Sequence, residues 1–279
     1  MSEVGTTVTR LTGRSARAVH AISGSVFAVE LSDGTAAVAK RHPEPSAALA
    51  EAASLRWLAE GPVRVPGVLG SGAGWLVMDR VPAGRAGRAA AEAFGRGLAG
   101  LHATGAGAFG VAPPGGPADA WIGAAPMRNE PGPAWPAWYA EHRIRPYLRP
   151  AADAGLLDAA IFDRVCARIE DLAGPSEPPA RLHGDLWSGN VLWADAEVWL
   201  IDPAAHGGHR ETDLAMLALF GCPHLDRILA AYDEHAPLAP GWPARVPLHQ
   251  LFPLLVHTVL FGGGYAGQAV AAARAALAG

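Results

Sequence analysis

The sequence contains only one lysine and two cysteines, and each low count bears on the kinds of site that the protein can form. Lys40 is the only lysine among the 22 lysine and arginine residues, so every other basic side chain of this kind is an arginine. The two cysteines, Cys166 and Cys222, are too few and too far apart for a disulfide framework or a thiolate metal site, as expected in a reducing cytosol. The formal net charge of −4 argues against a nucleic-acid partner and against an anionic membrane surface.

Targeting and membrane signals are also missing. The N-terminal stretch MSEVGTTVTRLTGR has no apolar core, so we expect no secretory signal and a cytoplasmic protein. The uncharged segment 251–270 is interrupted by Pro253, His257 and the glycines 262–264, which favours a buried helix followed by a break over a membrane span. Half of the 279 residues are hydrophobic and 17% are charged, which predicts one compact unit with a large core and no repeats.

The most informative stretch is RLHGDLWSGNVLWADAEVWLIDP, residues 181–203. The short apolar runs 191–193 and 198–201, joined by residues 194–197, predict a β-hairpin. The two ends of a hairpin lie side by side, so Asn190 and Asp202 should meet at its open end, with Asp185 in the preceding loop. Carboxylate and amide oxygens are the ligand type that suits Mg²⁺. This spacing is typical of a kinase-type phosphoryl-transfer site.

A simpler explanation exists for each of these residues alone, because Asp and Asn commonly form turns or caps. Their combined order and separation favour the catalytic interpretation. In it, Asp185 takes the proton of the acceptor hydroxyl, and Asn190 and Asp202 hold Mg²⁺ against the phosphates of ATP. The nearby loop with His206, His209 and Glu211 could suggest zinc, but three close ligands in a glycine-rich loop with no second cluster make a poor zinc site.

At these residues the chain resembles the fructosamine kinase (ketosamine 3-kinase) family, which is similar to aminoglycoside phosphotransferases and protein kinases. The sequence motifs that carry the resemblance are HGDLWSGN (183–190), IDPA (201–204), GHRE-x-DLAM (208–216) and, more distantly, WYAE-x-RI (138–144). The resemblance implies an α+β, protein-kinase-like fold of two lobes. Residues 1–80 would form a nucleotide-binding lobe with an antiparallel sheet and one helix, residues 78–82 a hinge, and residues 83–279 a mainly helical catalytic and acceptor-binding lobe.

Residues from about 8 to 41 are predicted to form strands, with turns at Gly24 and at Asp33-Gly34. In a kinase-like lobe the turn at Gly24 and Ser25 would cover the ATP phosphates, although an ordinary hairpin turn explains a single glycine equally well. Val38 and Lys40 share one face of the third strand by the period of two. This places Val38 against adenine and Lys40 on the phosphates, where a compact ammonium differs from a guanidinium.

The next helix is expected over residues 47–60, with Ser46 as its N-cap. Glu51 is the candidate partner that orients Lys40, and Glu60 is the rival. After two further strands, 65–69 and 75–79, the resemblance places the adenine contacts at Met78, Asp79 and Val81, while Met78 could equally be core filler.

The acceptor side is less defined. A helix is predicted over 86–103 and others over 137–148 and 156–172. Between them, residues 104–136 are rich in Gly and Pro, and form either a linker or an ordered segment near the acceptor site. We assign Trp187, Arg143 and His206 as candidate acceptor-binding residues.

The resemblance implies an ATP-dependent kinase that phosphorylates the O3 hydroxyl of a small-molecule or protein-bound ketosamine, after which the product loses its amine link (deglycation). Two alternatives remain. One is an aminoglycoside- or choline-type phosphotransferase of the same fold, and the other is a nucleotide-binding pseudokinase.

Overall fold

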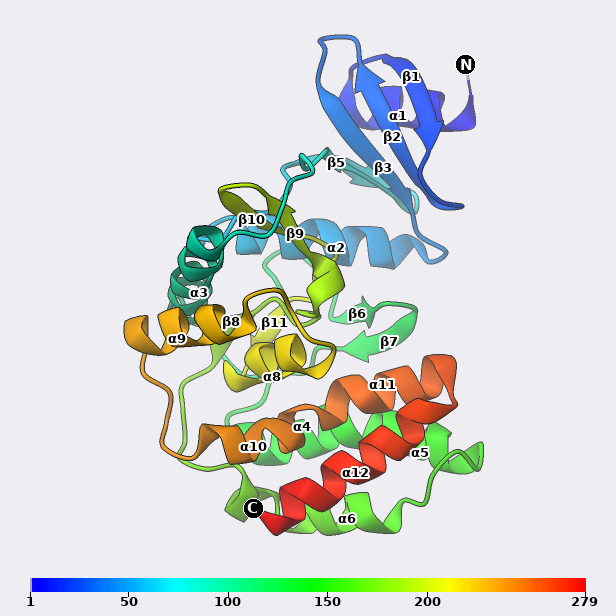
Figure 1. Ribbon diagram of the computed structural model, residues 1–279. Coiled ribbons are helices and arrows are strands. Elements are labelled where there is room, and N and C mark those ends of the chain that lie inside the picture. Colours follow the sequence, from blue (N-terminus) through cyan, green and yellow to red (C-terminus); the bar gives the residue numbers. More distant parts are fainter. Residues whose placement is uncertain (1) are drawn as a thin grey trace.

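The computed structural model describes residues 2–279 and begins with a helix and a five-stranded antiparallel sheet (Figure 1). Helix α1 (Glu3–Thr12) starts at the N-cap Ser2, whose Oγ accepts the N–H of Gly5, and ends at Gly13 in the left-handed conformation. The strand order is β1-β2-β3-β5-β4. Their bounds are β1 (Ala16–Ala21), β2 (Val26–Leu31), β3 (Ala36–Arg41), β4 (Val68–Gly72) and β5 (Trp75–Asp79).

Side-chain alternation gives this sheet two different faces. On one face Ala37 and Ala39 of β3 and Val77 of β5 are buried under α1 with Val8. On the other face Val38 and Met78 pack with the apolar residues of helix α2 (Pro45–Leu58). Lys40 has the same parity as Val38, so its side chain leaves the sheet on the α2 side.

The rest of the chain is mainly helical. Its elements are α3 (Arg88–Ala103), β6 (Asp119–Ile122), β7 (Ala125–Arg128), α4 (Trp135–Tyr139), the π-helix η1 (Ala140–Ile144), α5 (Arg145–Asp153), α6 (Ala160–Ala167), α7 (Ile169–Leu172), β8 (Ala180–Leu182), the 3-10 helix η2 (Ser188–Asn190), β9 (Val191–Ala194), β10 (Glu197–Leu200), β11 (His206–Gly208), α8 (Glu211–Leu219), α9 (Leu225–His235), α10 (Trp242–His249), α11 (Leu251–Phe261) and α12 (Gly264–Ala278). Three two-stranded sheets, β6-β7, β8-β11 and β9-β10, lie among these helices.

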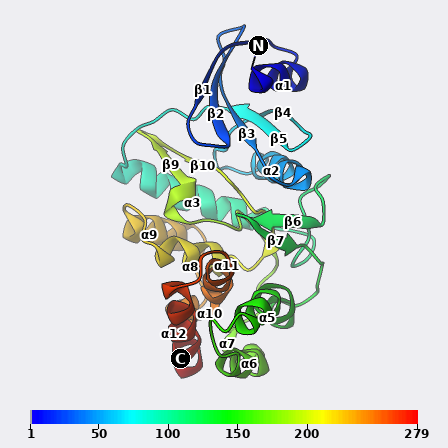
Figure 2. The same ribbon diagram turned by 90° about the vertical axis from the view of Figure 1, so that its right-hand side faces the viewer.

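Helix α2 links the five-stranded sheet to the helical part. Figure 2 shows it between the sheet and the β6–β7 hairpin, and it contacts β4, β5 and β6. Its residues Leu55 and Leu58 belong to a core shared with α3 and with the β9–β10 hairpin. Its Ala50 packs into a second core, formed by the β6–β7 hairpin and the C-terminal helices.

The uncharged segment near the C-terminus forms two helices. Helix α11 ends at Phe261, and Gly262 and Gly263 adopt positive φ angles of 61° and 57° before α12 begins. This agrees with the predicted helix and break. Among the described residues, no helix is both long and apolar enough to cross a membrane.

Two local predictions were wrong. The start of the predicted strand region, from residue 8, belongs to α1, because a capped helix with Val8 facing the sheet buries its apolar side despite several β-branched residues. Ser46 is not the N-cap of α2. Pro45 stands in the first turn, Glu44 is the N-cap without a side-chain cap bond, and the Ser46 hydroxyl instead accepts a hydrogen bond from Trp121.

The packing of α3 on α9 yields a stability prediction. An added Cβ at Gly95 would lie 2.3 Å from the carbonyl oxygen of Ile228, whereas nothing lies within 4 Å of one at Gly267 in α12. We expect Gly95→Ala to lower the free energy of unfolding by about 1–3 kcal/mol, through overpacking. The control Gly267→Ala should raise it by about 0.5–1 kcal/mol, because alanine favours an exposed helix. Urea titration of both variants measures the difference, and equal shifts would contradict the prediction.

Candidate active site

The loop after β8 is fixed by one buried carboxylate. Asp213, near the start of α8, accepts the N–H of His183 at 2.8 Å and that of Gly184 at 3.0 Å. His102 Nε2 lies 3.1 Å from the same carboxylate, and its Nδ1 lies 2.8 Å from the hydroxyl of Tyr232. Burial would raise the pKa of Asp213, but the hydrogen bond from His102 and the other donors hold it below its ordinary value. The ionised Asp213 therefore fixes the backbone of the loop at His183 and Gly184 through these hydrogen bonds.

Gly184 allows this loop to pass close to its neighbour. Its φ is +83°, and an added Cβ would lie 2.1 Å from the carbonyl oxygen of Ala204. Only glycine combines this conformation with this approach. His183 then bonds through Nε2 to the carbonyl of Ile201 at 3.0 Å, and its Nδ1 accepts the N–H of Asp185 at 3.3 Å. Burial lowers the pKa of His183, so the neutral ring acts as a brace.

The β9–β10 hairpin brings Asn190 and Asp202 together at its open end. Val191 pairs with Leu200, and Ile201 donates its N–H to the carbonyl of Asn190 at 3.1 Å. The Asn190 amide nitrogen donates to the Asp185 carbonyl at 2.7 Å and to its carboxylate Oδ2 at 3.1 Å. Asp202 has a φ of 53°, a left-handed conformation that is uncommon outside glycine and often occurs at functional sites.

Asp185 has the electrostatic properties of a general base. Burial raises its pKa to about 7, the hydrogen bond from Asn190 opposes this shift, and the nearby carboxylates of Asp202 and Asp213 add to it. A carboxylate with a pKa near neutrality accepts a proton more readily than an ordinary one, and about half of it is ionised at pH 7.

Lys40 joins the sheet, α2 and the hairpin at one point. Its Nζ lies 2.8 Å from Glu51 Oε2 and 2.9 Å from Asp202 Oδ1. Burial would lower the pKa of Lys40, but the charges of Glu51 and Asp202 outweigh it and raise the pKa. The amine is therefore protonated. The rival Glu60 lies elsewhere and pairs with Arg181 at 3.0 Å.

One cavity of about 390 Å³ is lined by half of the predicted site residues, including the predicted base, metal ligands and lysine. The predicted residues that line it are Ser25, Lys40, Glu51, Asp185, Trp187, Asn190 and Asp202. The structure does not bring the other predicted nucleotide contacts, Gly24, Val38, Met78, Asp79 and Val81, to this lining. Val38 and Met78 are paired on β3 and β5, and Asp79 accepts the N–H of Gly67 at 3.2 Å.

The three predicted acceptor residues lie in different environments. Trp187 is 38% exposed, lines the cavity and meets Phe220 edge to face with a centroid separation of 6.2 Å. Arg143 and His206 are buried away from the lining, and the structure does not support direct acceptor contact by either residue. Arg143 binds the carbonyl of Arg128 at 3.0 Å, while His206 bonds to the carbonyl of Ala204 at 2.9 Å. Burial lowers the pKa of His206 to about 3, so it is neutral.

Among the cavity residues that were not predicted as site residues, four carry aromatic rings: His42, Trp121, His257 and Phe261. His42 Nε2 lies 3.1 Å from Glu51 Oε2. It follows directly after β3 and stands two residues after Lys40, so the period of two along the strand was a usable signal. The remaining three come from the β6–β7 hairpin and α11, and no local pattern connects those segments to the catalytic loop.

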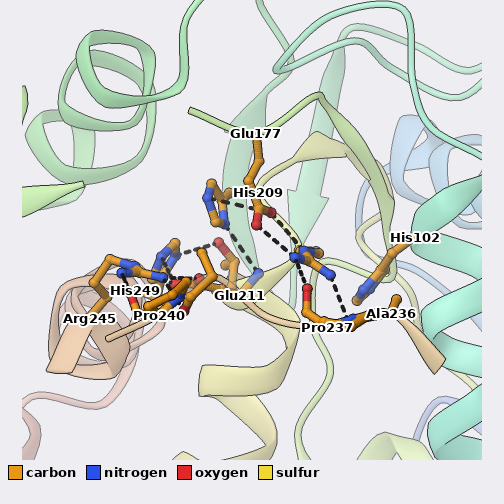
Figure 3. Close-up of polar contacts among 12 residues, drawn as sticks. His102, Glu177, His209, Glu211, Ala236, Pro237, Pro240, Arg245 and His249 are labelled. Atoms are coloured by element: carbon orange, nitrogen blue, oxygen red, sulfur yellow. Dashed lines mark hydrogen bonds and ion pairs between the residues drawn. The ribbon is translucent and has the colours of Figure 1, made fainter. Parts of the chain in front are cut away.

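The loop between β11 and α8 carries a second polar cluster, shown in Figure 3. The Glu211 carboxylate accepts hydrogen bonds from Arg245 Nε, at 2.9 Å, and from Arg245 Nη2. His249 Nε2 lies 3.3 Å from Glu211 Oε2. His209, Glu211 and His249 could together contact a metal ion, so His249, not His206, completes the group. However, the Arg245 guanidinium already bonds to both oxygens of Glu211, which makes Arg245 the cation of this cluster. Arg210 extends the network by a two-bond contact with Glu177 at 2.7 Å.

This cluster predicts acid sensitivity. Burial would raise the pKa of Glu211, but the hydrogen bonds from His249 and Arg245 lower it to about 2. A carboxylate with a lowered pKa stabilises the fold above its unfolded pKa of about 4.5, and this contribution is lost as the pH falls from there toward 2. We expect Glu211 to account for about 3 kcal/mol of this loss.

Urea unfolding of the wild type and of Glu211→Gln between pH 7 and pH 3 tests this. The variant should be less stable at pH 7, since Arg245 loses its charged partner, and its stability should fall less steeply below pH 4.5. The exposed pair of Glu130 and Arg128 supplies the control Glu130→Gln, which should follow the wild type. Parallel curves for wild type and Glu211→Gln would contradict the assignment.

Comparison with known proteins gives a consistent family. The model of the family described as Fructosamine kinase matches residues 38–278. A probable ketoamine kinase of Thermus thermophilus is 35% identical over 230 residues, which cover 81% of this chain and 80% of that protein. A chloroplastic protein-ribulosamine 3-kinase of Arabidopsis thaliana is 33% identical over 220 residues, covering 75% of this chain and 65% of its own length.

Solved structures extend the similarity to the fold. A Thermobifida fusca protein named as a candidate fructosamine-3-kinase is 49% identical, with a TM-score of 0.92 and coverage of 99% of both chains. An aminoglycoside phosphotransferase is only 16% identical, with a TM-score of 0.63 over 99% of this chain and 98% of its own. The latter likeness shows the fold alone. The architecture is thus the α+β, protein-kinase-like one predicted from the sequence.

Proposed function

The chain belongs to the fructosamine kinase family, and from this premise we propose that it phosphorylates the O3 hydroxyl of the sugar in ketosamines. It is a kinase that uses ATP and a hydroxyl acceptor, as its relatives' names indicate. The observation that carries the proposal is the presence of Lys40, Asp185, Asn190 and Asp202 in one cavity. The acceptor is a fructosamine- or ribulosamine-type ketosamine, free or attached to protein.

Asp185 acts as the base. Its carboxylate lines the cavity and has a pKa near 7, so it can orient the acceptor hydroxyl and take its proton as the new P–O bond forms. The Asn190 amide fixes one carboxylate oxygen at 3.1 Å, which sets the orientation of the base.

Lys40 neutralises phosphate charge, and Glu51 keeps it in place.

Residues up to about 80 serve as the nucleotide-binding lobe, residues 78–82 as the hinge and residues 83–279 as the catalytic and acceptor-binding lobe. The proposed nucleotide contacts are Ser25, which lines the cavity, and Gly24, Val38, Met78, Asp79 and Val81, which lie outside its lining. Because the protein performs little covalent chemistry itself, positioning and charge stabilisation account for the rate.

Asn190 and Asp202 fit a magnesium ion. The Asn190 nitrogen is bound to Asp185, which leaves its amide oxygen available, and Asp202 uses only Oδ1 for Lys40. Such oxygen donors are what Mg²⁺ requires. When bound, the ion would neutralise the charge of the β- and γ-phosphates.

The cavity favours a neutral sugar with an apolar amine substituent. Its described lining contains three carboxylates, Glu51, Asp185 and Asp202, and two of them are paired with Lys40. A polycationic antibiotic would find few free acidic partners there, which disfavours the aminoglycoside alternative. Trp187, with His257 and Phe261, offers aromatic surface beside the base.

After transfer, the O3-phosphorylated product loses its amine link without a further enzyme, in the cytoplasm.

Replacement of the base tests the mechanism. Asp185→Asn should reduce turnover by about 10²–10⁴-fold, because the amide cannot take the proton, while the affinity for ATP stays close to that of the wild type. Coupled ADP-release kinetics and a direct ATP-binding titration measure the two quantities. The exposed Asp171, on α7, provides the control Asp171→Asn, which should remain fully active. Wild-type turnover by Asp185→Asn would refute the role of the base.

A panel of acceptors tests the substrate class. Fructosyl-amines, ribulosyl-amines, an aminoglycoside and choline are compared in the same assay, and NMR locates the phosphate on the product. We expect turnover only with the ketosamines and phosphate at O3. Turnover confined to the aminoglycoside or choline would replace the proposal, and ATP binding without turnover on any acceptor would favour a pseudokinase.

A further inference from the structure

We propose that Trp121 is a positioning residue for the Lys40–Glu51 pair: by binding Ser46 it holds α2 where Glu51 meets Lys40. Trp121 lies on β6, far along the chain from both charged residues, and belongs to the wall of the same cavity. The proposal deepens the proposed function and relies on it for the role of Lys40 toward ATP.

The β6–β7 hairpin is anchored to the helical part of the protein. Arg143 donates from Nη1 to the carbonyl of Arg128 at 3.0 Å and from Nη2 to Asn129 Oδ1 at 2.8 Å. Tyr147 donates its hydroxyl to the carbonyl of Pro126 at 2.7 Å. The guanidinium of Arg143 is itself fixed over the ring of Trp138, 4.5 Å from its centroid. Strand β7 therefore has a defined position relative to η1 and α5.

The other strand of the hairpin holds α2. Trp121 Nε1 donates to Ser46 Oγ at 3.1 Å, in the first turn of the helix. Ala50, on the next turn, is buried with Ala120 and Ile122 of β6. The loop before β6 also approaches α2 closely, since an added Cβ at Gly116 would lie 2.9 Å from Ala53 Cβ. The hairpin thus bridges the helical part and α2.

Helix α2 needs this support at its first turn. Its N-cap, Glu44, makes no side-chain cap bond, so Ser46 provides the polar anchor there. Five residues of a rigid helix separate Ser46 from Glu51, a rise of about 7.5 Å, so a shift or rotation at Ser46 displaces the Glu51 carboxylate. Glu51 makes its contacts through one carboxylate oxygen only. Its Oε1 has no hydrogen-bond partner among the described residues, and only Oε2 meets Lys40 and His42.

The single lysine of the chain provides a direct assay. Acetic anhydride acetylates exposed, unpaired lysine amines most readily, whereas the side chain of Lys40 is only 19% exposed and its Nζ is bonded to Glu51 at 2.8 Å and to Asp202 at 2.9 Å. Peptide mapping by mass spectrometry separates this site from the N-terminal amine. The rate of Lys40 acetylation below the unfolding temperature therefore reports how firmly Glu51 holds Lys40.

We expect Trp121→Phe, which keeps an aromatic ring but removes the N–H, to raise the acetylation rate and weaken ATP affinity, each by about three- to ten-fold, the effect of one hydrogen bond. Ser46→Ala should give the same changes, and the double variant no more than either single one. The KM for the acceptor should change less than two-fold, because the ring remains in the cavity wall.

Trp199→Phe is the matched control, since the buried Nε1 of Trp199 has no hydrogen-bond partner among the described residues. It should leave acetylation and ATP affinity unchanged. If Trp121→Phe lowers only the unfolding temperature and leaves Lys40 acetylation and ATP affinity at wild-type values, the residue is merely structural and the proposal is overturned. Both readouts work without an acceptor, so their failure is distinct from a failure to phosphorylate ketosamines.

Discussion

The ion-paired ammonium of Lys40 joins three parts of the chain that fold from separate segments. Strand β3 supplies the lysine, α2 supplies Glu51 and the end of the β9–β10 hairpin supplies Asp202, 162 residues away. A buried charge of this kind is tolerated only if both partners are in place, so the sheet, the helix and the hairpin must all be positioned together. Asp213 imposes a similar condition behind the catalytic loop, where two backbone N–H groups and His102 converge on one carboxylate.

Much of this arrangement could be predicted from local patterns. The apolar runs flanking a short turn predicted the β9–β10 hairpin, and hairpin geometry alone then placed Asn190 beside Asp202. The period of two along β3 put Lys40 on the inner face, and the helix that follows supplied Glu51 at 2.8 Å. These predictions succeeded because the residues lie at the ends of regular elements, whose geometry fixes where the side chains emerge.

Other parts depend on contacts that no local pattern encodes. Residues 8–12 belong to a helix because α1 covers one sheet face, although their β-branched side chains suit a strand. Ser46 was predicted as an N-cap, but its hydroxyl instead accepts a hydrogen bond from Trp121, which lies in the glycine- and proline-rich region. Arg143 lies in a sequence motif that resembles the family. In the structure, η1 turns its side chain inward onto Trp138 and the end of β7. The motif therefore identified a structural residue and not an acceptor contact.

The scarcity of lysine has a chemical consequence for an enzyme of this proposed activity. Ketosamines arise when a reducing sugar condenses with an unprotonated amine and the adduct rearranges. Lys40 is the only side-chain amine in the chain, and its neighbours Glu51 and Asp202 keep it protonated and mostly buried. Apart from the N-terminal amine, the protein therefore offers reducing sugars no exposed amine to modify. An enzyme with the proposed activity would therefore carry few side chains on which its own substrate group could form.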